Sequence, residues 1–186
     1  MTSLCKTCKP KVKDVNMIQC CITRFNNKTW EENCMWRERN NLAHGCIYNT
    51  TSPMPISVNN VPNIFMIEMN ITTKTIIGVG FVKNQQELKR HFVYSDNKYN
   101  LYSYKSKYHI NKDEFNEEEI KLIEDLENVL FTGYCHMIRG IGISKLPNRL
   151  IHKIGKNENR IVTEYPNNYN EIFLKVFRRK YGKIYC

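Results

Sequence analysis

Tyrosines and lysines alternate in one short stretch of the sequence, YNLYSYKSKYHI, which ends at Ile110. If this stretch is a regular strand, Tyr102 and Tyr104 share one face, and Lys105 and Lys107 share the other. Aromatic rings can stack on bases while lysines contact phosphates, so the pattern is typical of a nucleic-acid-binding surface. Tyrosines at alternate positions are also common in half-buried strands, which makes ordinary packing the structural alternative.

Further cations could contact phosphates outside this strand. The chain carries 28 Lys and Arg residues against 18 Asp and Glu residues, and its formal net charge of +10 favours anionic partners, nucleic acid above all. Two other causes are open, namely lysine enrichment in an AT-rich genome and the stabilisation of cations at a helix C-terminus. The candidate phosphate contacts are Lys98 and the C-terminal cluster of Arg178, Arg179 and Lys180.

Most of the eight cysteines lie near the N-terminus. Cys5 and Cys8 have the spacing that presents two thiolates to one zinc ion, and Cys20 with Cys21 could complete the site. Because Cys20 and Cys21 are adjacent, they do not resemble the second half of a typical zinc site. Reduced buried thiols or a poorly ordered arm are therefore the main interpretation, with zinc as the alternative. Disulfides would require an oxidising setting, such as a viral particle that carries its own thiol oxidase.

Motifs of common enzyme classes are missing from the sequence. It contains no nucleophile elbow, zinc-protease motif, P-loop or dinucleotide-binding fingerprint. Cys135 and His136 are neighbours, and adjacent side chains on a strand point to opposite faces, which disfavours a catalytic pair. The sequence therefore favours a binding protein over an enzyme and assigns no catalytic residue.

The apolar pattern divides the chain into strands and helices. Strands are predicted from Met17 to Phe25, at GCIYN, and in one or two segments between His91 and Ile110. The segments IFMIEMN and TIIGVGFV, joined by a polar turn, predict a hairpin. In the second of these, Gly78 and Gly80 lie on the same face of the strand and provide no side chains there. This absence is explained by a bulge, by the corner of a barrel, or by the close approach of a helix or ligand. Barrel curvature is the favoured explanation.

Three helices are predicted around these strands. A capping box of Thr29 and Glu32 predicts the first helix near residues 30–42. An acidic helix within 111–133 and a basic helix near the C-terminus each have one apolar face. The residues expected to be buried on them are Ile120, Ile123, Leu126, Leu130, Ile172, Phe173, Val176 and Phe177.

The predicted elements fit one α+β domain over residues 17–186, preceded by a basic cysteine-containing arm over residues 1–16. No apolar run reaches the roughly 18–20 residues that span a bilayer. The N-terminal residues also lack the apolar segment of a secretory signal. We therefore expect an intracellular protein without a membrane partner.

The order of these segments resembles the PUA-like superfamily of small β-barrels, which includes the EVE, ASCH and YTH domains. The resemblance covers about Met17 to Leu150 and is carried by TWEENCMWR, GCIY, the pair IFMIEMN and IIGVGFV, and YKSKYHI. The segments YNLYSYKSKYHI and HMIRGIGISKLP also resemble stretches in uncharacterised proteins of large cytoplasmic DNA viruses.

The resemblance implies a small β-barrel with about three flanking helices and a pocket between the first helix and the sheet. In such proteins the pocket is often lined by aromatic residues that receive a modified base. Carried over to this sequence, it implies Trp30, Trp36 and Tyr48 as the pocket wall. It implies Arg37 and Arg39 as a phosphate clamp.

Three functions follow as hypotheses. The first is a non-catalytic nucleic-acid-binding module, with RNA favoured over DNA, that reads a modified base. The second is a structural or accessory protein of a viral particle that contacts other virion proteins. The third is a PUA-like enzyme acting on RNA or a nucleotide. A viral origin would place the protein in the host cytoplasm or nucleus, or in the virion.

Overall fold

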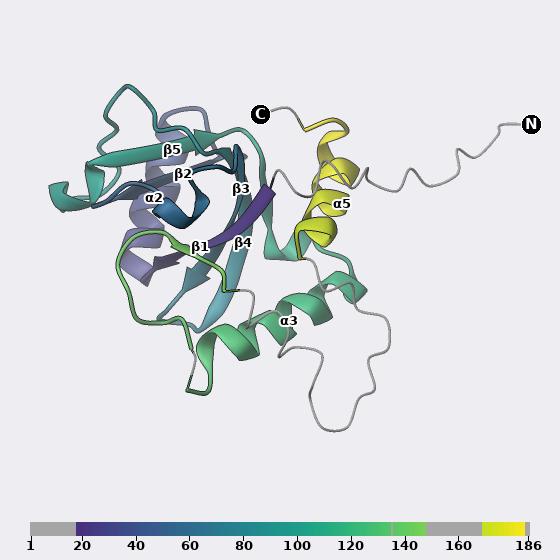
Figure 1. Ribbon diagram of the computed structural model, residues 1–186. Helices are drawn as coiled ribbons and strands as arrows, with labels where there is room; N and C mark the ends of the chain where they lie inside the picture. Colours follow the sequence, from purple (N-terminus) through teal and green to yellow (C-terminus); the bar gives the residue numbers. More distant parts are fainter. Residues whose placement is uncertain (1–17, 135, 148–168, 185–186) are drawn as a thin grey trace, which may run out of the picture.

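A mixed sheet of five strands, in the order β6-β4-β3-β1-β7, forms the centre of the fold (Figure 1). The computed structural model describes residues 18–134, 136–147 and 169–184. Its long strands are β1 (Ile18–Phe25), β3 (Asn63–Asn70) and β4 (Thr75–Lys83), and β6 (His109–Asn111) and β7 (Ser144–Lys145) are short edge strands. β1 pairs with β3 in parallel, whereas the other neighbours are antiparallel.

The predicted hairpin of β3 and β4 is confirmed. The two strands pair from Asn63 opposite Lys83 to Asn70 opposite Thr75, with a register shift between Glu68 and Met69. Apolar residues fill both faces of β3, because elements pack on both sides of the sheet. The strand is therefore almost continuously apolar rather than alternating.

A second, two-stranded sheet is formed by β2 (Cys46–Thr50) and β5 (Tyr102–Ser106), which pair with each other in antiparallel fashion. Together with helix α2 (Asn27–Arg39), it covers one face of the central sheet. Short 3-10 turns occur at Ile56–Val58, at Asn97–Asn100 and at Lys112–Glu114. The second sheet and α2 share one hydrophobic cluster with the even-numbered residues Ile64, Met66 and Val82 of the central strands.

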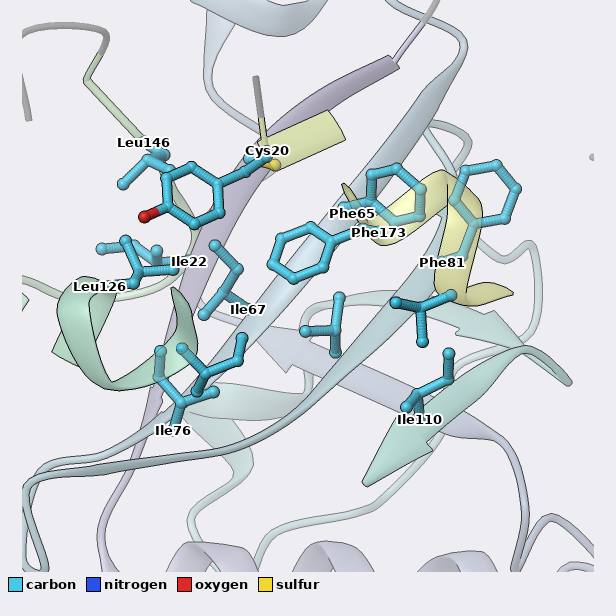
Figure 2. Close-up of a cluster of buried hydrophobic side chains, with 14 of the residues drawn as sticks. Cys20, Ile22, Phe65, Ile67, Ile76, Phe81, Ile110, Leu126, Leu146 and Phe173 are labelled. Atoms are coloured by element: carbon cyan, nitrogen blue, oxygen red, sulfur yellow. The ribbon is translucent and has the colours of Figure 1, made fainter. Parts of the chain in front are cut away.

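The other face of the sheet is covered by α3 (Glu117–Phe131) and α5 (Tyr169–Tyr181) (Figure 1). Figure 2 shows Phe173 of α5 and Leu126 of α3 among Phe65, Ile67 and Ile22 of the strands. The ring centroids of Phe65 and Phe173 are 5.6 Å apart. The predicted apolar faces of the two helices are confirmed by the burial of Ile123, Leu126, Leu130, Phe173, Val176 and Phe177, with Ile120 and Ile172 partly buried beside them.

Helix α2 begins three residues earlier than predicted. Its N-cap is Asn26, whose Oδ1 accepts a hydrogen bond from the Thr29 backbone N–H at 2.8 Å, while the Thr29 hydroxyl accepts from the Asn26 N–H at 3.0 Å. The capping box is therefore Asn26 with Thr29, and the predicted box of Thr29 with Glu32 is wrong. Asn is as good an N-cap as Ser or Thr, and it lies one turn earlier.

The small closed β-barrel expected from the PUA-like resemblance is wrong. In the described part of the chain, β6 and β7 stand at opposite edges of the central sheet, and β2 and β5 pair only with each other. The fold is α+β, with three α-helices among the described residues and two separate sheets. β1 lies inside the central sheet between β3 and β7, and the second sheet packs against that sheet as a layer.

The glycine pair in β4 makes room for a buried polar cluster instead of curving a barrel. The Tyr48 hydroxyl donates to Glu68 Oε1 at 2.8 Å, and His109 Nε2 lies 2.9 Å from Glu68 Oε2. All three side chains are at most 2% exposed. A Cβ at Gly80 would overlap the Tyr48 hydroxyl, and one at Gly78 would lie 3.0 Å from His109 Nε2.

This cluster keeps Glu68 ionised in the interior. Burial by itself raises the pKa of Glu68, but the His109 imidazole, with further contributions from Arg37 and Tyr48, holds that pKa below its ordinary value. A carboxyl with a depressed pKa stabilises the fold above its unfolded-state pKa of about 4.3. That stabilisation is lost as the pH falls through the lower folded-state value.

We expect Gly80→Ala to lower the free energy of unfolding by about 1–3 kcal/mol or more, because the added methyl displaces the Tyr48 hydroxyl from Glu68. Urea denaturation at neutral pH measures the change. Lys83→Ala, at an exposed position of the same strand, is the control and should stay within about 0.5 kcal/mol of the unmodified protein. Equal stability of the two variants would contradict the packing described for Gly80.

We expect Glu68→Gln to destabilise the protein by about 3–5 kcal/mol at neutral pH, since it leaves His109 without its buried partner. The difference from the unmodified protein should shrink as the pH falls below about 4.3, where Glu68 of the unfolded chain becomes protonated, and on through the lower folded-state pKa of Glu68. Denaturant unfolding at several pH values between neutral and acid tests this. The exposed Glu118→Gln is the control. A difference independent of pH would show that the Glu68 charge does not stabilise the fold.

Candidate nucleic-acid interface

A small hollow lies where the carboxyl end of β1 meets the N-terminus of α2. Its volume is about 150 Å³. Its walls also include parts of β2, the turn after β3, the segment 94–99 and the loop 140–142. Because β1 and β3 run in parallel, their carboxyl ends meet at this edge of the sheet. We call this hollow the helix-end pocket. The residues that line it include Thr23, Arg24, Asn49, Tyr94, Tyr99 and Ile141.

Arg24 brings a positive charge to the helix-end pocket. Its Nε donates to the Met137 carbonyl at 2.5 Å, and its Nη1 donates to Ser144 Oγ at 3.2 Å and to the Gly142 carbonyl at 3.4 Å. Within residues 18–134, 136–147 and 169–184, no carboxylate pairs with this guanidinium and Nη2 makes no hydrogen bond. Arg24 is therefore a half-buried cation that is held by neutral acceptors and retains donors for a ligand.

Gly140 allows the loop after α3 to close over this guanidinium. Its φ of +132° is a conformation that favours glycine. A Cβ there would lie 3.4 Å from both Cζ and Nη2 of Arg24. The contact is tight, and the loop contributes Ile141, 70% exposed, to the pocket.

Asn49 lines the same pocket. Its Nδ2 donates to the His91 carbonyl at 2.7 Å and to Asn100 Oδ1 at 3.0 Å, so the amide orientation is fixed. The side chain is 6% exposed, and its Oδ1 is buried without a hydrogen-bond partner among the described residues. A buried acceptor left unpaired costs about 1–3 kcal/mol. The wall of the pocket thus includes a residue whose amide acceptor is unpaired and closed off from solvent.

Asn100 fixes the aromatic wall of the pocket. This fully buried side chain accepts from the backbone N–H groups of Val93 at 3.0 Å and Tyr94 at 3.1 Å, and donates to the Tyr94 carbonyl at 2.7 Å. The Tyr94 and Tyr99 rings meet edge to face with centroids 6.3 Å apart. Tyr94 is buried, whereas Tyr99 is 38% exposed at the rim.

A second, larger hollow of about 470 Å³ lies beside β5. It is lined by Lys83, Lys89 and Lys105, with Gln85, Gln86 and Ser106 between them. Glu87 compensates one of these charges, since its Oε2 lies 3.5 Å from Lys105 Nζ. We call this the lysine hollow. β5 begins three residues after Tyr99 and reaches the lysine hollow at Lys105 and Ser106.

The aromatic residues implied by the resemblance are not grouped around one opening. Tyr48 is buried in the Glu68 cluster. Trp30 packs on Phe25 with centroids 5.1 Å apart, and Trp36 packs on the His91 ring at 5.2 Å. These contacts tie α2 to the core.

The tyrosines of the strand at 102–106 face the interior more than the solvent. Tyr104 is buried and its hydroxyl accepts from the Met54 N–H at 2.9 Å, while Tyr102 is half-buried against the second core cluster. Packing therefore accounts for Tyr104 fully and for Tyr102 in part. Tyr99, which precedes this strand in the sequence, is more exposed than either of them.

The predicted phosphate contacts on α2 and near β5 divide into buried and exposed residues. Arg37 is buried and its Nη1 donates to the Gly45 carbonyl at 3.0 Å, whereas Arg39 is exposed. Lys98 and Lys107 are exposed, and Lys105 lines the lysine hollow beside Glu87. A phosphate could reach Arg39, Lys98, Lys105 and Lys107 without any change in the fold, but could not reach Arg37.

The C-terminal cluster is largely compensated by acids. Arg179 forms two hydrogen bonds to Glu119, at 2.7 and 2.9 Å, and Lys180 Nζ lies 2.5 Å from Glu114. Arg178 is half-buried and is not without a partner. These pairs hold α5 to the start of α3, so the net charge of the cluster overstates the field that an anion would meet.

Cys20 and Cys21 do not converge on one centre. They lie on opposite faces of β1, Cys20 in the cluster under α3 and α5 and Cys21 in the cluster under α2. Burial raises the pKa of both thiols, that of Cys21 to about 12, which disfavours the thiolate that zinc requires. Cys5, Cys8 and Cys135 and the predicted arm over residues 1–16 lie outside the described residues. In the described part of the chain no cluster of His, Cys, Asp or Glu is arranged to hold a metal ion.

The pocket residues Arg24, Asn49, Tyr94 and Tyr99 were not predicted as site residues. Arg24 interrupts an otherwise apolar strand, and the glycines of IRGIGI permit a close approach, so both signals were present in the sequence. Neither signal identifies its partner, because the residues that meet at the pocket are far apart along the chain.

No protein-family model, curated protein or solved structure was found to match this chain. The PUA-like resemblance and the virion and enzyme hypotheses therefore stay predictions. Among the described helices, none has the length and apolarity needed to cross a membrane.

Proposed function

We propose that the protein is a nucleic-acid-binding module, with RNA favoured, that inserts one unstacked base into the helix-end pocket. The observation that carries the proposal is the combination, in one hollow of about 150 Å³, of an uncompensated guanidinium, an unpaired amide acceptor and two tyrosine rings. Sequence-specific RNA binding commonly uses splayed-out bases held by stacking and by hydrogen bonds to their edges.

The size of the pocket supports a polymeric ligand. Sites that enclose a whole small molecule usually have about 300–1,000 Å³, so this pocket takes only one group of a larger ligand. The remainder of that ligand would lie on the surface. Tyr99 at the rim offers a face for a neighbouring base, and the lysine hollow offers cations for phosphates beyond it.

The charges that remain exposed support an anionic chain. Lys83, Lys89, Lys98 and Lys107 are exposed and lie at or near the two ends of β5. A strand of five residues extends about 17 Å, which several nucleotides of a single strand can span. The path from Tyr99 past β5 to the lysine hollow is therefore the proposed course of the backbone.

We expect affinity for a single-stranded oligonucleotide to fall steeply with salt, with a log–log slope of about −3 to −4, if four or five phosphates are neutralised. Fluorescence anisotropy with a labelled RNA, titrated from about 50 mM salt upward, measures the slope. Absence of binding at about 50 mM salt would remove the proposal.

We expect Tyr99→Ala to weaken RNA binding about tenfold, since the loss of one stacked base corresponds to about 1–3 kcal/mol. Tyr134→Ala, at a fully exposed tyrosine outside the pocket, is the matched control and should bind like the unmodified protein. Thermal unfolding of both variants establishes that they are folded. Equal affinities for Tyr99→Ala and the control would exclude stacking at this rim.

A further inference from the structure

We propose, building on the function proposed above, that the helix-end pocket selects a single-ring pyrimidine base over a purine. The inference names the class of base, which neither the charge nor the aromatic wall specifies. It follows from the size of the pocket and from the hydrogen-bonding groups that remain available in it.

The volume of the pocket matches one six-membered ring. A protein cavity of about 150 Å³ is known to accommodate benzene, and the helix-end pocket has a volume of about 150 Å³. A purine has a second fused ring, which exceeds this volume, so a purine would either stand out of the mouth beside Tyr99 and Ile141 or displace the Tyr94 or Asn49 wall. Tyr94 cannot move freely, because Asn33 donates to its hydroxyl at 3.3 Å and Asn100 holds its backbone.

The polar groups of the pocket match a neutral heterocycle better than a phosphate. Arg24 Nη2 can only donate, and Asn49 Oδ1 can only accept, because both N–H groups of the Asn49 amide are already used. The Thr23 hydroxyl, which lines the same hollow, can do either. A phosphate has no N–H for Asn49, and an ammonium group would be repelled by Arg24. Uracil and cytosine carry both N–H groups and acceptors on their edges.

The mouth of the pocket offers a position at which to test this selection. Ile141 lines the pocket and is 70% exposed, so a larger side chain there can obstruct the opening without disturbing the core. Tyr134 lies in the same segment between α3 and β7, is fully exposed, and does not line the pocket. Ile141→Trp and Tyr134→Trp therefore add the same indole to an obstructing and to a neutral position.

The experiment compares a short oligoadenylate with the same oligomer carrying one central uridine or cytidine, by fluorescence anisotropy with the full chain. A single pyrimidine should tighten binding at least about fivefold in the unmodified protein and in Tyr134→Trp, and the gain should disappear in Ile141→Trp. Uridine monophosphate is added as a competitor. Its effect shows whether the pocket binds a pyrimidine of a free nucleotide or only one within a polymer. Thermal unfolding verifies that both variants are folded.

The outcomes separate the two proposals. Equal affinity for oligoadenylate with and without the pyrimidine, or a gain that survives in Ile141→Trp, overturns pyrimidine selection and leaves nucleic-acid binding standing. Binding of uridine monophosphate that Ile141→Trp abolishes, with no binding of any oligonucleotide, supports ring selection and refutes the polymer proposal. Absence of binding by all of these probes refutes both.

Discussion

A carboxylate at the centre of the molecule, that of Glu68, sets the constraint on which the rest of the structure depends. A buried charge is tolerated only when it is hydrogen-bonded and compensated. Tyr48 on the second sheet and His109 on the edge strand β6 supply these partners. The cluster therefore fixes how the two sheets pack, and Gly78 and Gly80 supply the space that it needs. The C-terminal helix is tied to the same point, because Lys180 and Tyr181 both donate to the His109 carbonyl.

This packing also explains why the polar groups of the candidate site gather at one edge. The cluster and the apolar residues occupy the middle of the central sheet, so unpaired polar groups can reach ligands only where strands end. The carboxyl ends of β1 and β3 meet there, beside the start of α2. Asn100 and Gly140 then bring two loops onto that edge, one with the tyrosines and one over Arg24. A pocket of a single ring's size results from this convergence.

Local compensation, more than net charge, determines the electrostatic surface. The chain has a formal charge of +10, but Lys112, Arg179 and Lys180 are paired with acids of the segment that contains α3. Those pairs fasten elements to one another and reduce the field on that side. In the described part of the chain, Arg24 and the exposed Lys83, Lys89, Lys98 and Lys107 form no ion pair with that segment. An anionic partner would therefore meet one part of the surface and not the whole molecule.

The sequence by itself determined the local elements. Apolar runs specified β1, β3 and β4, and the amphipathic periods of α3 and α5 identified which residues would be buried, since these patterns depend on neighbours along the chain. It also indicated that Gly78 and Gly80 admit a close neighbour, without showing that the neighbour is a tyrosine and not a barrel wall. The tertiary structure decided that the sheet stays open, that Tyr48, Tyr104 and Arg37 are buried, and that Arg24, Asn49 and Tyr99 meet in one pocket. Those outcomes depend on contacts between residues far apart in the chain. The types and spacing of neighbouring residues do not show which distant residue each side chain contacts.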